Sequence, residues 1–517
     1  MQKRNLMLAS RSALPIFILA LAALVYGMYG FDGALLRDYS IYLYSGQRVA
    51  EGIPPYVGIF DHKGPLSPMI AGFGVMLSKL FDWDDILTVR LVFFATGCLT
   101  VMAVYLLGKS IFRSQVAGAF AALTFLGFYA YGYPAASGPE PKTPMVLFQT
   151  LSLLFASRKR WFWAGLFGSL AFLVWQPMAV FSIVTFVLAV TRPKEERRSA
   201  ALHAVAGVIT PLVAVGAYFY YHGALEDLLD GAVFFNARYL QRGAYTTTPL
   251  IFRVLSDPSY LWEAISNVVL AYSTMLAPII IGLGMIFRLY FLRPYQYRFA
   301  PILLSFPAPF LWALLDFQLS DDFYVYLPYA AVGFGAFLTS VIYRIETPRL
   351  AGVLFGVALL GVAIANTFDI NPIATHQVLG TNIRLSQQRE GALEIENRFG
   401  EDVRLASINS PQVLVLLHRK NPNPYLFITA GIDRYIDAKE PGGFEGWLEG
   451  LETSDVISFF GEGQALLPGD EASTEHREEL LGWLGSYYHI EKIGPWYVFV
   501  KDSLDNPDPS QKVVLKE

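Results

Sequence analysis

The strongest constraint on this chain is a series of long apolar runs in its first 368 residues. A membrane-spanning helix needs about 20 consecutive apolar residues, and lipid offers its backbone no hydrogen-bond partners outside the helix itself. Three further runs, 142–157, 161–176 and 177–191, are short, and we include them because basic clusters border them. The runs of full length that we expect to span a membrane are 13–31, 87–108, 115–132, 201–221, 265–286, 299–316, 323–342 and 350–368.

Composition supports a membrane protein and argues against other classes. Of the 517 residues, 54% are hydrophobic and only 16% are charged, whereas soluble domains carry about 25% charged residues. So much apolar material also excludes a disordered chain. The formal net charge is −4, and lysine and arginine are scattered, so we expect no nucleic-acid partner. The one cysteine, Cys98, has no second thiol for an internal disulfide.

Basic clusters between the runs predict how the chain crosses the membrane. Lysine and arginine are enriched in cytoplasmic loops. If every cluster faces the cytoplasm, the chain crosses about eleven times, with a cytoplasmic N-terminus. The same count makes the apolar run 65–81 a juxtamembrane or re-entrant segment on the outer side. A cleaved signal peptide is the alternative for the first run, which is however longer than the usual apolar region of about 7–15 residues. The clusters lie at 3–11, 109–113, 158–160, 192–198, 288–298 and 344–349.

From about residue 376 the chain has the pattern of a small α/β domain, which we place outside the cytoplasm. Helical spacing occurs at 384–399 and 475–487. We expect a transmembrane domain at 1–370, an extracytoplasmic α/β domain at 371–505 and a disordered tail at 506–517. The α/β domain is expected to be a lid or a protein-contact domain, with acceptor binding as the alternative. Strand-like stretches occur at 403–408, 425–429, 456–460 and 496–500.

The predicted outer loops carry the chemically notable side chains. Asp38 follows the first run, and Asp61-His62-Lys63 lies in a proline-rich turn. Glu140 lies before another apolar run, and an ionised carboxylate at a membrane boundary is costly without a partner or a function. In the second long outer loop, which we predict at 222–264, Arg238 and Arg242 are spaced to share one helix face. Contact with lipid headgroups is the simpler interpretation of those arginines.

The order of these elements resembles the outer loops of GT-C glycosyltransferases, in particular the protein O-mannosyltransferase and lipid A aminoarabinose transferase group. The resemblance covers about residues 13–345. It departs at Gly64, where the group often has a second proline, and at Glu140, where many members have aspartate. In this group a basic residue often precedes a late aromatic run, which is Tyr324 to Pro328 in this chain. Here Asp321 and Asp322 stand at that place. The matching elements are Asp38, the turn Gly52-Ile53-Pro54-Pro55-Tyr56, the segment Asp61 to Leu66, Arg90-Leu91, Glu140 and the run Tyr324 to Pro328.

The resemblance implies a polytopic α-helical GT-C fold and a sugar donor linked to a polyprenyl phosphate. An acceptor hydroxyl on a glycan, glycolipid or protein attacks the anomeric carbon, and Asp38 takes its proton as general base. Glu140 would position the acceptor, a cation or the loop. No cofactor is assigned, and a divalent cation stays open. The residues implied to bind the donor phosphate or the substrate are Asp61, His62, Lys63, Arg90, Arg238, Arg242, Tyr324 and Tyr326.

Two other classes compete with this interpretation. A transporter or flippase of a lipid-linked sugar normally shows internal repeats and ionisable residues near the bilayer centre. This chain shows no repeat, and its charges cluster at the ends of the apolar runs. A membrane scaffold would leave Asp38, the Asp61 turn and Glu140 without a role. We therefore expect a multi-pass glycosyltransferase of the cell membrane.

Overall fold

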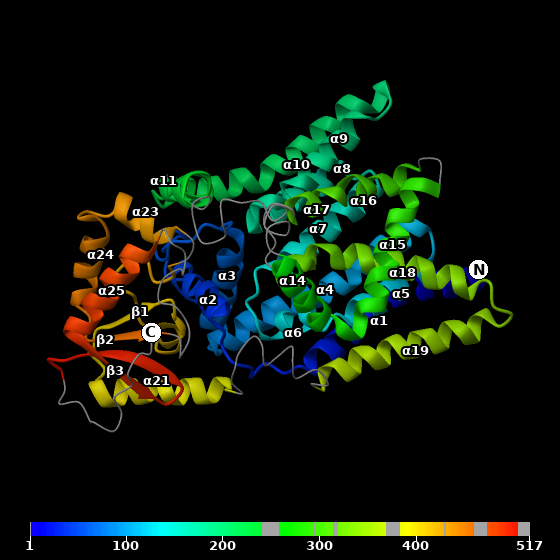
Figure 1. Cartoon of the computed structure of the whole chain (residues 1–517). Helices are drawn as coiled ribbons and strands as arrows, with labels where there is room; N and C mark the ends of the chain where they lie inside the picture. Colours follow the sequence, from blue (N-terminus) through cyan, green and yellow to red (C-terminus); the bar gives the residue numbers. More distant parts are fainter. Residues whose placement is uncertain are drawn as a thin grey trace. The chain divides into compact units, whose positions relative to one another are not determined.

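The computed structural model is mostly helical and groups the chain into two compact units, which we describe separately (Figure 1). The first unit comprises 1–31, 90–215 and 249–380, and the second comprises 32–89, 216–248 and 381–517. The predicted boundary at 370 and the predicted tail at 506–517 lie outside the described residues. The structure describes residues 2–239, 258–292, 296–313, 319–368, 383–428, 431–459 and 473–504.

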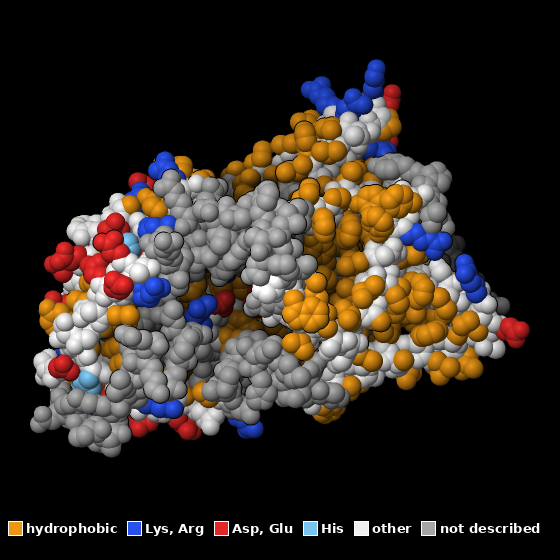
Figure 2. All heavy atoms as spheres, viewed as in Figure 1, with side chains coloured by type: hydrophobic (Ala, Val, Ile, Leu, Met, Phe, Trp, Pro, Cys, Tyr) orange, Lys and Arg blue, Asp and Glu red, His pale blue; other side chains and the backbone are white. Residues whose placement is uncertain are grey.

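The first unit is built from apolar helices. On the face shown in Figure 2, hydrophobic side chains gather over these helices, and on α19 Leu350, Val353 and Leu354 are well exposed. Such a surface suits lipid rather than water. The helices are α1 (Gln2–Gly27), α4 (Asp85–Phe112), α5 (Gln115–Leu126), α6 (Tyr129–Ser137), α7 (Lys142–Ser157), α8 (Trp161–Val174), α9 (Ala179–Val190), α10 (Lys194–Tyr221), α14 (Pro258–Ala271), α15 (Leu276–Leu292), α16 (Ala300–Ser305), α17 (Pro307–Ala313), α18 (Leu327–Ile342) and α19 (Pro348–Thr367).

Within the described residues, five helices are long and apolar enough to cross a membrane. The expected span at 115–132 is broken: α5 and α6 meet at 67°, because Gly127 closes α5 with a tight turn to Thr124. The expected span at 299–316 is likewise interrupted between α16 and α17, where Pro307 has no N–H to continue the ladder. The long helices are Asp85–Phe112, Lys194–Tyr221, Ser273–Phe291, Asp322–Ile342 and Pro348–Thr367.

Glycines set the close packing of α15, α18 and α5. A Cβ atom on Gly282 would lie 2.0 Å from the carbonyl oxygen of Ala330, and one on Gly333 would lie 2.1 Å from the carbonyl oxygen of Gly282. A Cβ atom on Gly335 would lie 2.5 Å from the carbonyl oxygen of Ala117. Membrane helices gain van der Waals contact in this way, because lipid removes the hydrophobic drive for association.

The second unit contains both outer segments and the C-terminal domain. Its sheet has the strand order β1-β2-β4-β3, with β1 and β2 parallel and the other two pairs antiparallel. Its elements are α2 (Arg37–Val49), α3 (Leu66–Phe81), α11 (Leu225–Leu229), the π-helix η2 (Asp230–Phe235), α12 (Asn236–Arg238), α21 (Leu385–Phe399), β1 (Leu405–Ile408), α22 (Gln412–Leu416), α23 (Ile432–Lys439), α24 (Gly443–Glu452), β2 (Val456–Phe459), α25 (Thr474–Tyr487), β3 (Tyr488–Ile493) and β4 (Trp496–Lys501).

The predicted α/β pattern of this domain is mostly confirmed. The helices at 384–399 and 475–487 and the strands at 403–408, 456–460 and 496–500 correspond to α21, α25, β1, β2 and β4. The strand predicted at 425–429 is wrong for the described residues 425–428. The backbone groups of Leu426 and Ile428 bond to the main chain and side chain of Asn409 instead of joining the sheet. Strand β3 was not predicted.

We predict that Gly282→Ala destabilises the first unit. The new methyl group has no room against the backbone of Ala330, so α15 and α18 must separate, at a cost of about 1–3 kcal/mol. Gly284→Ala is the matched control on the same helix, because no atom lies within 4 Å of its added Cβ. Thermal unfolding of the detergent-solubilised protein measures both variants. Equal melting temperatures for the two would contradict the packing argument.

Candidate active site

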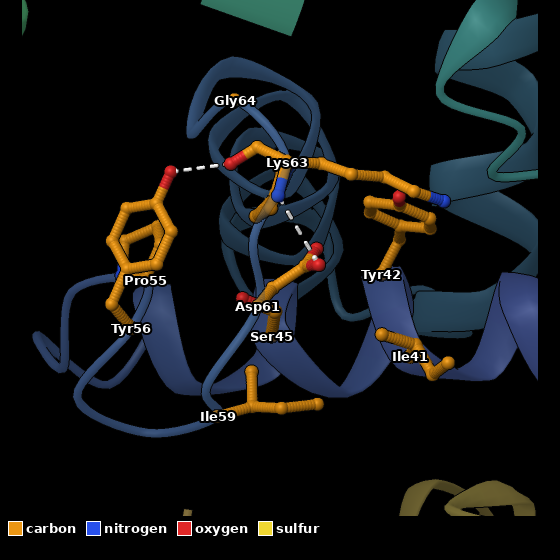
Figure 3. A pocket seen from close by; sticks show the side chains of 10 residues that line it. Ile41, Tyr42, Ser45, Pro55, Tyr56, Ile59, Asp61, Lys63 and Gly64 are labelled. Carbon is orange, nitrogen blue, oxygen red and sulfur yellow. Dashed lines mark hydrogen bonds between the residues drawn. The ribbon is translucent and has the colours of Figure 1, made fainter. Parts of the chain in front are cut away.

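The turn Asp61 to Gly64 of the second unit is tightly held by hydrogen bonds (Figure 3). Asp61 is 7% exposed, and its Oδ1 atom accepts the backbone N–H groups of His62 at 2.7 Å and Lys63 at 3.3 Å. The Tyr56 hydroxyl donates to the Lys63 carbonyl at 2.6 Å. Burial raises the pKa of Tyr56 well above its usual value, so this phenol stays protonated and continues to donate.

A small pocket lies beside this turn, between the turn, α2 and the start of α3. Asp61, Lys63 and Tyr56 contribute to it, and the Lys63 side chain extends toward Tyr42, with Nζ 5.7 Å from the centre of that ring (Figure 3). A lysine ammonium within about 6 Å of an aromatic ring centre is attracted to the face of the ring. The residues that line the pocket therefore include a lysine and a buried carboxylate.

His62 is held neutral by its surroundings. Burial lowers its pKa from the usual value near 6.5 to about 4, although the neighbouring Asp61 carboxylate acts in the opposite direction. The His62 ring packs on Phe235, with 5.7 Å between ring centres. At neutral pH this side chain offers an uncharged imidazole.

Aromatic packing also fixes the Asp61 to Gly64 turn. Phe60, which precedes Asp61, stacks on Tyr435 of α23 with ring centres 4.5 Å apart, and its N–H donates to the Pro424 carbonyl at 2.9 Å. Phe235 of η2 packs edge-on against Phe60 at 5.3 Å. The C-terminal domain and both outer segments therefore share one apolar core.

The second outer segment contacts the turn through its π-helix. The Asn236 side-chain amide donates to the His62 carbonyl at 2.7 Å, and a Cβ atom on Gly231 would lie 2.5 Å from the Tyr56 ring. Arg238 follows on an exposed face, with its guanidinium 5.5 Å from the ring centre of Phe234. Arg242 lies outside the described residues. Irregular π-helical turns are frequent at functional sites.

Asp38 lies in the first turn of α2 and is about half exposed. Its Oδ1 atom is 3.2 Å from Nε of Arg37, and the Asp38 side chain is 49% exposed. A carboxylate is favoured at this end of a helix because the first backbone N–H groups point toward it. The site thus combines an accessible carboxylate on a helix with a fixed turn in the same unit.

In the first unit, Glu140 is held by its own turn. Its Oε1 atom accepts the Lys142 backbone N–H at 3.1 Å. The Lys142 ammonium pairs with Asp322 at 2.9 Å, and these side chains are 12% and 5% exposed. Such a buried pair avoids the cost of an isolated charge. This pair was not predicted, although both residues stand at the ends of apolar runs.

The other predicted residues of the first unit are buried. Arg90 is fully buried and donates to the Phe31 carbonyl. The Tyr324 hydroxyl donates to the Ala130 carbonyl, and Tyr326 packs against Phe306 and Phe323. In the described residues these rings therefore take part in packing, and their predicted contact with substrate stays a prediction.

Of the predicted site residues, the second unit brings Asp61, His62 and Lys63 together and links them to Asn236. In the second unit, the hydrogen bonds of Tyr56 and Asn236 to the turn were not predicted. Tyr56 lies within the proline-rich turn already noted, whereas Asn236 carries no local signal. Among the described residues, no group of three or more histidine, cysteine or acidic side chains is arranged to hold a metal ion.

We predict a pH-dependent loss of stability from His62. Because the pKa of the folded state is about 4 and that of the unfolded chain is near 6.5, the unfolded chain binds more protons between these values. Stability therefore falls as pH is lowered from about 6.5 to 4, by on the order of 3 kcal/mol. Melting temperatures at pH 7 and pH 4.5 measure the loss. His62→Gln should show a smaller loss, and the exposed control His203→Gln should resemble the natural chain; the same loss in all three would exclude His62.

Comparisons with known proteins agree with this architecture. A family model described as dolichyl-phosphate-mannose-protein mannosyltransferase matches residues 62–221. A comparison with curated proteins found no match. The fold is similar to that of ArnT from Cupriavidus metallidurans bound to undecaprenyl phosphate, with a TM-score of 0.60, 14% identity and coverage of 96% of this chain and 99% of ArnT.

Two structures of an archaeal oligosaccharyltransferase are also similar. The apo enzyme from Archaeoglobus fulgidus gives a TM-score of 0.52 at 13% identity, covering 96% of this chain and 76% of that one. AglB from the same organism, in complex with an inhibitory peptide and a dolichol-phosphate, gives 0.50 at 12% identity, covering 97% and 76%. These matches confirm the resemblance stated from the sequence: the chain is a multi-pass membrane protein with the GT-C glycosyltransferase fold.

Proposed function

We propose that this protein transfers a sugar from a polyprenyl-phosphate donor to an acceptor hydroxyl outside the cytoplasm, with Asp38 as general base. The observation that carries the proposal is the Asp61 to Gly64 turn, which holds Lys63 with its ammonium beside the Tyr42 ring of α2. The lipid phosphate would bind there. Undecaprenyl phosphate in the ArnT structure and a dolichol-phosphate in the AglB structure support a donor of this class.

The charge distribution suits departure of a phosphate. As the glycosidic bond breaks, negative charge grows on the phosphate oxygens, and a fixed cation stabilises it. Lys63 is the cation of the turn, and Asp61 holds the Lys63 backbone, so the ammonium is positioned before the donor binds. Arg238 and Arg242 stay as further phosphate contacts in this proposal.

The proton of the attacking hydroxyl needs a base. Asp38 is the accessible carboxylate at the start of α2, with Arg37 beside it, and such general bases contribute about 10²–10⁴-fold to rate. Glu140, whose carboxylate is held by the Lys142 backbone, positions the acceptor or its loop.

The orientation in the membrane belongs to the same proposal. The first outer loop, predicted at 32–86, the described part of the second, 222–239, and the C-terminal domain lie in one unit, and each was predicted to lie outside the cytoplasm. Their shared unit supports an extracytoplasmic active site and a cytoplasmic N-terminus. A polyprenyl-linked donor is also consistent with an active site at the membrane surface, because the lipid keeps the sugar there.

We predict that Asp38→Asn lowers the transfer rate by about 10²–10⁴-fold and leaves binding of undecaprenyl phosphate unchanged. Glu140→Gln should cost less, because it acts on positioning. The assay follows radiolabelled sugar from a panel of undecaprenyl-phosphate hexoses and pentoses to envelope acceptors. Asp32→Asn is the matched control, since its side chain is exposed in the same segment. Full activity in Asp38→Asn would remove Asp38 as base, and movement of the lipid-linked sugar across vesicles without transfer would favour a flippase.

We predict that Lys63→Met weakens binding of undecaprenyl phosphate about 10–100-fold, the loss expected for a hydrogen bond to a charged group. Lys63→Arg should keep most of the affinity, because the cation remains. Lys79→Met, at the exposed end of α3, serves as control. Titration of the protein in nanodiscs measures all three. Unchanged affinity in Lys63→Met would place the phosphate elsewhere.

A further inference from the structure

We propose that Gln388 of the C-terminal domain is a positioning residue for Asp38, a role that rests on the proposed function of Asp38 as general base. Gln388 lies on α21 and is 4% exposed. Its side-chain Oε1 accepts the Leu35 backbone N–H at 2.6 Å, and its Nε2 donates to the Leu35 carbonyl at 3.1 Å. One amide therefore satisfies both polar groups of a single peptide residue.

That residue lies directly before the helix that carries Asp38. Leu36 caps α2, and the cap has no side-chain hydrogen bond of its own. The start of α2 is therefore fixed by the segment before it. Because Leu35 is fully buried, its backbone groups need partners, and Gln388 supplies them. The amide thus sets where the first turn of α2 begins.

The same segment is paired to α21 at two further points. Gly33 forms an antiparallel bridge with Arg384, and the Leu385 N–H donates to the Asp32 carbonyl at 3.2 Å. On the other side of Leu35, the Arg37 guanidinium lies 5.4 Å from the ring centre of Phe427. Contacts from the C-terminal domain therefore flank the approach to Asp38 on both sides.

Gln388 is itself anchored to the sheet. Its backbone carbonyl accepts the Trp496 indole N–H at 3.1 Å, and Trp496 is the first residue of β4. A Cβ atom on the neighbouring Gly391 would lie 2.4 Å from Pro495, so α21 packs closely on the strand end. A continuous set of hydrogen bonds thus runs from β4 through Gln388 to Leu35.

The consequence for catalysis is geometric. A general base must lie within hydrogen-bond reach of the proton that it takes, and a misplacement of about 1 Å can cost about 100-fold in rate. Without the Gln388 amide, the Leu35 backbone would need other partners, and the first turn of α2 would shift. Gln388 acts through this backbone and not by contact with substrate.

The test compares Gln388→Met with Glu390→Met in the full-length protein, using the undecaprenyl-phosphate sugar that gives transfer. Methionine keeps the length of the side chain but makes neither hydrogen bond. We expect kcat to fall about 10–100-fold with KM for the donor within about twofold. The control residue is exposed on the same helix, so its variant should keep full activity.

Hydrogen–deuterium exchange supplies a readout that is independent of activity. In Gln388→Met we expect faster exchange in peptides covering 32–40 and unchanged exchange in β2 and β4. Unchanged exchange at 32–40, or faster exchange throughout the second unit with loss of activity, would overturn the positioning role.

The double variant separates this inference from the proposed function. In the Asp38→Asn background, Gln388→Met should cause no further loss of the residual rate, because its effect passes through Asp38. A further loss equal to that in the natural chain would overturn the inference. Full activity of Asp38→Asn alone would instead overturn the general base, while the exchange result at 32–40 would still report on Gln388.

Discussion

The candidate site depends on the stacking of Phe60 on Tyr435. Three segments far apart in the sequence meet there: the first outer loop, the π-helix that carries Phe235, and α23. The chemically active turn that follows Phe60 has no regular secondary structure, and such loops are usually mobile. The hydrogen bonds within this short turn do not fix its geometry alone. Burial of the large aromatic rings beside it does so. The C-terminal domain is therefore a structural part of the site.

Polar contacts fix the position of α2, the helix that bears Asp38. Helix α2 is buried along most of its length although its composition is polar. Gln47 donates to Asp85 and to the Val415 carbonyl, and the Tyr44 hydroxyl accepts the Asn421 N–H. A buried helix of this kind is stable only when its polar groups are satisfied. Partners from the C-terminal domain allow α2 to remain helical and still expose Asp38 at its first turn.

Much of the fold was predictable from local signals, and the site was predictable only in part. Apolar runs identify the long helices, and short, mostly apolar stretches identify β1, β2 and β4. The stretch at 425–428 has the composition of a strand, but Asn409 takes its hydrogen bonds. Asp61 and Lys63 could be chosen from their motif. The roles of Asn236 and Gln388 could not, because a single amide in a loop or helix has no periodicity and its partner lies more than 170 residues away.

The pairing of Lys142 with Asp322 explains how this chain departs from the group that it resembles. That group often has a basic residue before the late aromatic run, where this chain has acid. An isolated carboxylate there would be costly, and Asp322 is 5% exposed. The cation comes instead from the start of α7, and the same lysine holds Glu140 through its backbone N–H. Lys142 therefore balances the charge of Asp322 and links the Glu140 turn to the segment before the late aromatic run.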